Sequence, residues 1–192
     1  MRGDVVILTG PPGAGKSTTA AALAAGFEKS VHLHTDDFWH FIAAGAVPPY
    51  LPESDRQNQT VLRVIALAAL AYAEGGYTVV VDGIIGPWML HHFQRAQRDD
   101  PATSTHYVVL RPARETTLAR AQARTGPDAL TAAEPVLAMW DQFADLADLE
   151  RHVLDTGDQS PEQTLEAVRE ALKSESFRFP QNRDMSNKSV TT

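Results

Sequence analysis

Cysteine is absent from this chain of 192 residues. Its absence excludes disulfides, thiolate metal sites and cysteine nucleophiles. Long apolar runs are absent too, because no stretch, residues 64–73 included, reaches the roughly 18 apolar residues that a membrane span needs. The short apolar run before Gly10 does not match a signal peptide. We therefore expect a cytoplasmic protein without membrane contacts.

Positive charge is also scarce. The net charge is −7 and the pI is about 5.4. The lysines are Lys16, Lys29, Lys173 and Lys188. A long polyanion such as DNA or RNA normally binds a basic stripe, and none is visible here. The composition argues against a dedicated nucleic-acid surface, but not against a ligand the size of a nucleotide. It does not predict an oligomeric state.

Short apolar segments alternate with helical patterns along the chain. The expected strands are 4–8, 31–34, 77–81, 105–110 and 152–155, and the expected helices are 16–27, 36–44, 54–74, 88–98, 112–124, 132–148 and 161–174. This alternation predicts an α/β fold in which helices cover both faces of a parallel sheet. We take residues 1–174 as one domain and expect the polar residues 175–192 to be a disordered tail.

The segment GPPGAGKS, residues 10–17, follows the first expected strand and fits the pattern G-x-x-x-x-G-K-[ST]. Glycines let such a loop point its N–H groups inward, and the next helix N-terminus adds to an anion site. Lys16 would reach the β- and γ-phosphates, and Ser17 would give a hydroxyl to Mg²⁺. The predicted nucleotide-binding residues of this loop are Gly10, Pro11, Pro12, Gly13, Ala14, Gly15, Lys16, Ser17 and Thr18.

Asp82 ends the third expected strand, in the segment VVVDG. A carboxylate at the end of a buried strand matches a Walker B position, where it holds Mg²⁺ directly or through water. We therefore predict Ser17 and Asp82 as the metal residues. The alternative is that Asp82 only caps the following turn.

Two acids, Asp36 and Asp37, follow the second expected strand. A kinase needs a carboxylate at this edge to take or orient the proton of an acceptor hydroxyl. We predict Asp36 as this base, with Asp37 as the second choice. The alternative is that these acids cap the next helix.

Together, the loop at 10–17, the acid pair, Asp82 and the arginine-bearing helix 112–124 resemble the small P-loop kinases. That group includes shikimate kinase, gluconate kinase, chloramphenicol phosphotransferase and the 5′-kinase domain of polynucleotide kinase. The resemblance covers about residues 4–172. It implies a three-layer α/β/α P-loop NTPase fold whose five-stranded parallel sheet has the order 2-3-1-4-5. It also implies ATP with Mg²⁺ as the phosphate donor, and a short lid at about 125–130.

The resemblance extends to Arg120 and Arg124, which lie four apart on one helix face. In similar kinases the first such arginine stacks on adenine and the second contacts phosphates, and backbone like that of residues 156–158 borders the adenine. The lid segment carries no arginine. The cations left to neutralise charge in the transition state are therefore Lys16, Arg120 and Arg124. The alternative is that the two arginines are solvated surface residues.

The acceptor is expected between the helix after Asp36, the long helix and the segment after Asp82. The predicted substrate residues are Asp36, Asp37, Trp39, His40, Arg56, Asp82 and Trp88. Aromatic walls with few charges suit a neutral or weakly charged hydroxyl compound, although both tryptophans could instead be core residues.

The sequence thus predicts an ATP-dependent phosphotransferase that acts on a hydroxyl of a small molecule, such as a metabolite or an antibiotic. One alternative is a nucleoside, nucleotide or polynucleotide 5′-kinase, which would need more anion-binding residues near the acceptor. Another is a nucleotide-binding regulator or toxin-like P-loop protein, which would not need the acid pair.

Overall fold

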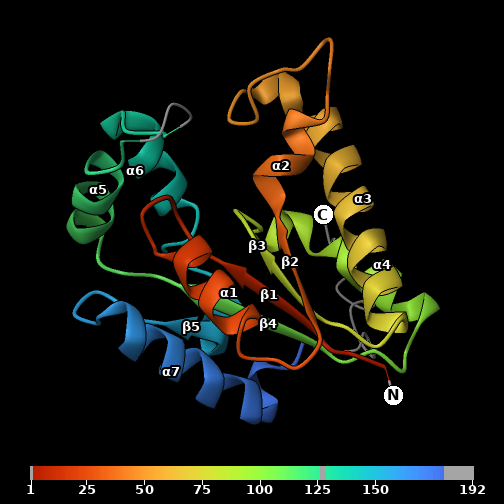
Figure 1. Ribbon diagram of the computed structural model, residues 1–192. Helices are drawn as coiled ribbons and strands as arrows, with labels where there is room; N and C mark the ends of the chain where they lie inside the picture. Colours follow the sequence, from red (N-terminus) through yellow and green to blue (C-terminus); the bar gives the residue numbers. More distant parts are fainter. Residues whose placement is uncertain (1, 126–128, 180–192) are drawn as a thin grey trace, which may run out of the picture.

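Five parallel strands form the centre of the protein, in the order β2-β3-β1-β4-β5 (Figure 1). The computed structural model describes residues 2–125 and 129–179. The strands are β1 Val5–Thr9, β2 Ser30–His34, β3 Thr78–Asp82, β4 Thr105–Leu110 and β5 Val153–Leu154. The α-helices are α1 Lys16–Ala24, α2 Thr35–His40, α3 Asp55–Glu74, α4 His91–Asp99, α5 Arg114–Gln122, α6 Ala133–Asp141 and α7 Pro161–Lys173. The predicted three-layer fold and strand order are confirmed.

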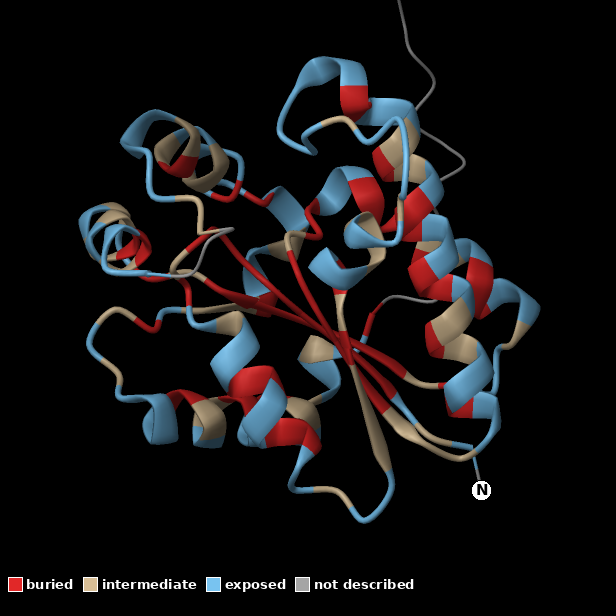
Figure 2. Ribbon diagram, turned by 45° about the horizontal axis from the view of Figure 1, so that its top comes forward, coloured by how far each residue is buried: buried red, intermediate tan, exposed pale blue. Residues whose placement is uncertain are grey.

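The strands are apolar on both faces because each face packs against helices. Val5 and Ile7 of β1 belong to the core formed with α3 and α4, whereas Val6 and Leu8 belong to the core formed with α1 and α7. All four side chains are at most 1% exposed. Figure 2 shows the central strands as the most continuously buried part of the chain. A strand buried on both sides reads as an unbroken apolar run, which explains the sequence pattern.

The parallel register brings the carboxyl ends of neighbouring strands together. Leu8 pairs with Asp82 on β3, and Asp82 in turn pairs with His34 on β2. The segments that follow these strands are the glycine-rich loop, the turn at Gly83 and helix α2. They therefore emerge side by side at one edge of the sheet, as the alternation predicts.

Several expected helices are shorter than predicted, and α2 and α6 differ most. Helix α2 ends at His40 rather than at residue 44. The chain beyond it forms a loop, in which the Gln57 side chain accepts from the Val47 N–H at 2.9 Å and donates to the Val47 carbonyl at 2.7 Å. A side chain that pairs with both backbone groups replaces the hydrogen bonds that a helix would supply.

The expected helix 132–148 is α6 followed by a separate 3-10 helix, η3 Ala147–His152. Ala147 has a φ of 50°, which interrupts a right-handed helix. Asp145 accepts a hydrogen bond from the Ala147 N–H at 2.9 Å, and Glu150 accepts one from the Leu146 N–H at 2.8 Å. These side-chain acceptors favour the turn over continued helix.

The start of the expected disordered tail is ordered. Residues Glu175–Phe177 form the 3-10 helix η4, and Arg178 bridges to His106 of β4. The Phe179 N–H donates to the Thr105 carbonyl at 2.8 Å, and its side chain is 3% exposed. The prediction was wrong for residues 175–179, because the aromatic Phe179 finds a place in the α3–α4 core. Residues 180–192 lie outside the described residues.

The expected lid at 125–130 falls largely on residues 126–128, which also lie outside the described residues. Helices α5 and α6 flank this segment. Among the helices of the described ranges, none combines the length and apolar character that a membrane crossing requires.

Candidate functional site

The glycine-rich loop after β1 has a backbone that only glycine adopts easily. Gly10, Gly13 and Gly15 have φ values of 142°, 81° and 88°. A Cβ atom on Gly10 would lie 2.1 Å from the Leu110 carbonyl oxygen, and one on Gly13 would lie 2.5 Å from that of Thr117. The loop is therefore pressed against β4 and α5, and α1 starts directly after Gly15. This arrangement forms the anion cradle that the motif predicts.

The Lys16 side chain lies back across this loop. Its Nζ donates to the Pro11 carbonyl at 2.9 Å. Burial lowers the pKa of the Lys16 ammonium to about 8, although the carboxylates of Asp82 and Asp36 oppose that shift, and Arg124 adds to it. The charges of Asp82, Asp36 and Arg124 therefore all act on the Lys16 ammonium.

Asp82 is fully buried and holds two hydrogen bonds. Ser17 Oγ donates to its Oδ2 at 2.6 Å, and His32 Nε2 lies 2.5 Å from its Oδ1. Burial alone would raise the pKa of Asp82, but the hydrogen bonds from His32 and Ser17 outweigh it and hold that pKa below its usual value. Asp82 is thus an ionised carboxylate that meets the serine hydroxyl of the loop.

This pair of oxygens fits the predicted Mg²⁺ site. A hydroxyl and a carboxylate are the hard oxygen donors that Mg²⁺ prefers, and a nucleotide-bound Mg²⁺ needs only one or two protein ligands. Within residues 2–125 and 129–179, no group of three or more His, Cys, Asp or Glu that could hold a metal ion occurs.

The acid pair lies in the first turn of α2, after His34 as the N-cap residue. Asp36 and Asp37 are exposed, and neither accepts a backbone hydrogen bond within the described part of the chain. His34 Nδ1 lies 3.4 Å from Asp37 Oδ1, and His34 Nε2 lies 3.9 Å from Asp36 Oδ2. The capping alternative is therefore not what these carboxylates do in the structure.

The predicted acceptor residues of α2 and the turn after β3 differ in their surroundings. Trp39 donates to Asn58 on α3 at 2.8 Å and packs against the core, so it is partly a structural residue. His40 is exposed. Trp88 is 40% exposed, and its ring meets that of Phe143 edge-on at 5.8 Å.

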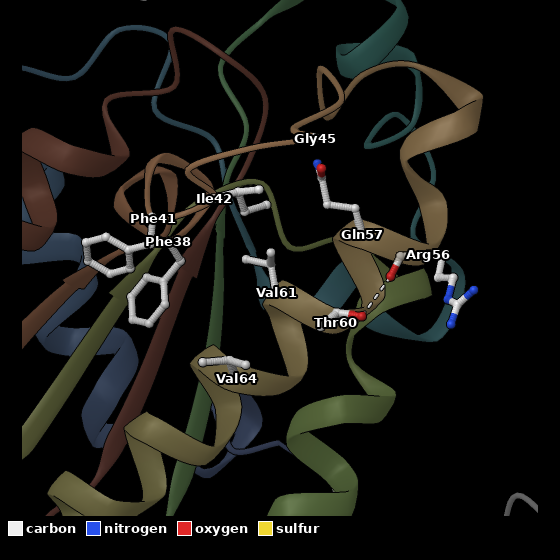
Figure 3. A pocket seen from close by; sticks show the side chains of 9 residues that line it. All are labelled: Phe38, Phe41, Ile42, Gly45, Arg56, Gln57, Thr60, Val61 and Val64. Carbon is white, nitrogen blue, oxygen red and sulfur yellow. Dashed lines mark hydrogen bonds between the residues drawn. The ribbon is translucent and has the colours of Figure 1, made fainter.

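A separate hollow of about 560 Å³ lies between α2 and α3. Its lining is Phe38, Phe41, Ile42, Gly45, Arg56, Gln57, Thr60, Val61 and Val64 (Figure 3). Phe38 and Phe41 are three apart and contact each other, whereas Asp36 shares a helix face with Trp39 and His40. The Arg56 guanidinium points away from the two phenylalanines (Figure 3). The hollow therefore lies on a different side of α2 from the predicted base.

The two predicted arginines are placed differently. Arg120 donates to the carbonyls of Thr156 at 3.3 Å and Gly157 at 3.0 Å, in the loop between β5 and α7. Arg124 is exposed, and its charge contributes to lowering the pKa of Lys16. Arg120 thus holds the loop that was expected to border adenine, and Arg124 is an exposed cation whose charge acts on Lys16.

Sequence reasoning missed His32, although its signal was present. In the segment SVHLH, histidines alternate with Val31 and Leu33, so His32 and His34 share one face of β2. That face is the one opposite the α3 core, to which Leu33 belongs. Polar residues repeated on one face of a strand indicate a polar partner on the neighbouring strand.

A family model described as an AAA domain matches residues 5–149. This range contains the glycine-rich loop, the acid pair and Asp82. Among curated proteins, no match was found.

Several solved kinase structures resemble this fold. A sugar kinase from Janibacter sp. HTCC2649 has a TM-score of 0.65 at 22% identity, over 89% of this chain and 95% of that chain. APS kinase from Mycobacterium tuberculosis, in complex with AMPPNP and APS, has a TM-score of 0.65 at 19% identity, over 90% and 99% of the two chains. Shikimate kinase from Acinetobacter baumannii, in complex with shikimate, has a TM-score of 0.63 at 18% identity, over 89% and 93%. At these identities the similarity shows a shared small P-loop kinase fold.

Proposed function

Because the chain belongs to the AAA domain family and has the fold of the small P-loop kinases, we propose that it is an ATP-dependent phosphotransferase. It transfers the γ-phosphate of Mg·ATP to a hydroxyl of a small molecule, such as a metabolite or an antibiotic. In this proposal, residues 1–174 form the kinase domain and the protein is cytoplasmic.

The observation that carries the proposal is the position of Asp36 beside the phosphate cradle. Asp36 follows Thr35, whose side chain packs against Gly83 directly after Asp82, so its carboxylate stands at the edge of the sheet where the cradle lies. Its charge accordingly opposes the lowering of the Lys16 pKa. A pure nucleotide switch has no use for a carboxylate there, whereas a kinase uses one to orient an acceptor hydroxyl. Asp37 is less suitable as the base, because its Oδ1 lies 3.4 Å from His34 Nδ1, whereas Asp36 Oδ2 lies 3.9 Å from His34 Nε2.

Each residue of the cradle has a role that follows from its chemistry. The loop N–H groups from Gly13 to Thr18 and the Lys16 ammonium bind the phosphates, and Arg124 adds positive charge at the same place. Ser17 and Asp82 would hold Mg²⁺, which neutralises phosphate charge when it is bound. Arg120 orders the loop at Thr156 and Gly157 against which the adenine would rest.

The neutral or weakly charged acceptor is supported by the residues next to Asp36. Trp39 and His40 follow Asp36 on one face of α2, and Trp88, in the segment after Asp82, adds a partly exposed aromatic ring. A multiply anionic acceptor would need several convergent cations, which these residues do not provide.

The test is ADP release from Mg·ATP across hydroxyl-bearing metabolites, nucleosides and antibiotics, with Lys16→Ala beside the wild type. A compound that stimulates the wild type but not the variant would establish the kinase and its substrate class. Stimulation only by nucleosides or oligonucleotide 5′ ends would favour the 5′-kinase alternative. Tight ATP binding without stimulation by any compound would instead point to a regulator. Equal turnover by Lys16→Ala and the wild type would remove the proposed site.

A further inference from the structure

The carboxylate of Asp82 has a second partner that the phosphotransferase motifs do not include. His32 Nε2 lies 2.5 Å from Oδ1, while Ser17 Oγ donates to Oδ2 at 2.6 Å. An ionised carboxylate can only accept hydrogen bonds, so the Nε2 atom of His32 must carry the proton. Each oxygen of Asp82 is therefore held by one donor, and the orientation of the carboxylate is determined from both sides.

Strand geometry explains why His32 reaches this carboxylate. In the parallel register His34 pairs directly with Asp82, and His32 lies two residues earlier on the same face of β2. The ring of His32 meets that of His34 edge-on at 6.3 Å. His34 is turned toward the acid pair, where its Nδ1 lies 3.4 Å from Asp37 Oδ1. His32 thus contacts the carboxylate of Asp82, whereas His34 lies nearest to the acid pair of α2.

We propose that His32 is a positioning residue for the Mg²⁺·nucleotide site, which it serves by fixing the Asp82 carboxylate with Oδ2 toward Ser17. The inference rests on the proposed function, because it concerns the same phosphate cradle. His32 touches neither the phosphates nor the reacting atoms in this assignment. It acts through Asp82, in the way that hydrogen-bond partners of metal-binding carboxylates orient their ligands.

The alternative is that His32 only stabilises a buried carboxylate. Its side chain is 26% exposed, whereas that of Asp82 is 1% exposed, so loss of the histidine would leave Oδ1 buried without this donor. Loss of a donor to a buried carboxylate lowers the free energy of unfolding, whatever the function of the site. The two roles differ in one quantity: only the positioning role changes how much Mg²⁺ strengthens nucleotide binding.

The experiment measures the dissociation constant of ADP by titration calorimetry, once with Mg²⁺ and once with a chelator. The ratio of the two constants is the factor by which Mg²⁺ strengthens ADP binding, which we call the Mg²⁺ gain. Partial unfolding of a variant would change both constants by the same factor, so it does not affect this ratio. We compare the wild type with His32→Leu, which has no donor, and with His32→Gln, whose amide Nε2 can replace the imidazole Nε2–H. His106→Gln serves as the control, because His106 lies on β4, which β1 separates from the strand that carries Asp82.

His32→Leu should reduce the Mg²⁺ gain by about 10- to 100-fold, the usual cost of removing an outer partner of a metal ligand, and leave Mg²⁺-free binding unchanged. His32→Gln should recover most of the gain, and His106→Gln should match the wild type. If His32→Leu does not fold, His32→Asn takes its place, since its shorter amide cannot reach Asp82.

The outcomes separate the inference from the proposed function. Wild-type binding with a normal Mg²⁺ gain in His32→Leu or His32→Asn would overturn the positioning role alone. A lower unfolding temperature with an unchanged ratio would do the same and assign His32 a structural role. No ADP binding by the wild type would overturn both the inference and the kinase proposal.

Discussion

Gly83 and Thr35 approach each other so closely that no side chain fits between them. A Cβ atom on Gly83 would lie 1.9 Å from Thr35 Oγ1 and 2.8 Å from its Cβ. Thr35 is the first residue of α2 and Gly83 follows Asp82, so this contact sets the distance between the predicted metal residue and the acid pair. The contact between the Gly83 backbone and the Thr35 side chain therefore adds to the β2–β3 pairing in holding the predicted cradle and the predicted base together.

Gly83→Ala should therefore disturb the site and the fold together. The added methyl group must displace α2, at a cost of about 1–3 kcal/mol in the free energy of unfolding, as for other overpacked positions. Urea unfolding measures that cost, and turnover measures the displacement of Asp36. Gly26→Ala is the control, because its methyl group would meet no atom nearer than the flexible end of Arg169 at 3.2 Å and the Leu23 carbonyl oxygen at 3.3 Å. A Gly83→Ala protein with wild-type stability and turnover would contradict the close contact.

Substitutions of the two acids of α2 should differ in their effect on the rate of phosphate transfer. Asp36→Asn should keep ATP affinity but lower phosphate transfer by on the order of a hundredfold, because the amide cannot take a proton from the acceptor. Asp37→Asn should have a much smaller effect. Steady-state rates and ADP binding of both variants decide the assignment. The opposite order of effects would transfer the role to Asp37, and two fully active variants would remove it from the pair.

Nucleotide affinity should depend on the charge of Lys16. Burial lowers the pKa of its ammonium to about 8 in the free protein, and a bound phosphate favours the charged form and raises that pKa again. Binding therefore takes up a proton above this pKa, so affinity is full below it and falls by up to about tenfold per pH unit above it. Calorimetric ADP titrations at about pH 7 and about pH 9 measure the change.

Lys16→Arg is the control for this pH dependence, because a guanidinium stays charged over the whole range. Its affinity for ADP should not decline on the alkaline side. If the ADP affinity of the wild type also stayed constant between about pH 7 and about pH 9, the Lys16 ammonium would not lose its charge in that range.

Arg120 and Arg124 should affect different steps. Arg120→Ala removes the donors to the carbonyls of Thr156 and Gly157, so nucleotide binding should weaken by about tenfold. Arg124→Ala removes a cation near Lys16, and the transfer rate should fall by about a hundredfold with less effect on binding. ADP titration and single-turnover transfer measure the two effects. Identical losses in both variants would argue against this division of roles.

The sequence by itself determined the fold class and the cradle. The apolar strands and the loop at 10–17 carry local signals, since a strand buried on both faces and a backbone with positive φ at three glycines each restrict the residues allowed. The acid pair and Asp82 were found because parallel strands present their carboxyl ends at one edge. That residues 1–174 act as one kinase domain stays a prediction.

The tertiary structure alone decided which side chains meet across long separations. His32 and Asp82 are 50 residues apart, and only the register between β2 and β3 brings the donor to the carboxylate. The attachment of Arg120 to Gly157 likewise depends on how the loop after β5 approaches α5. The burial of Phe179 also depends on partners elsewhere in the chain, in the core formed with α3 and α4. Periodicity encodes which face a residue occupies, but only packing decides what that face touches.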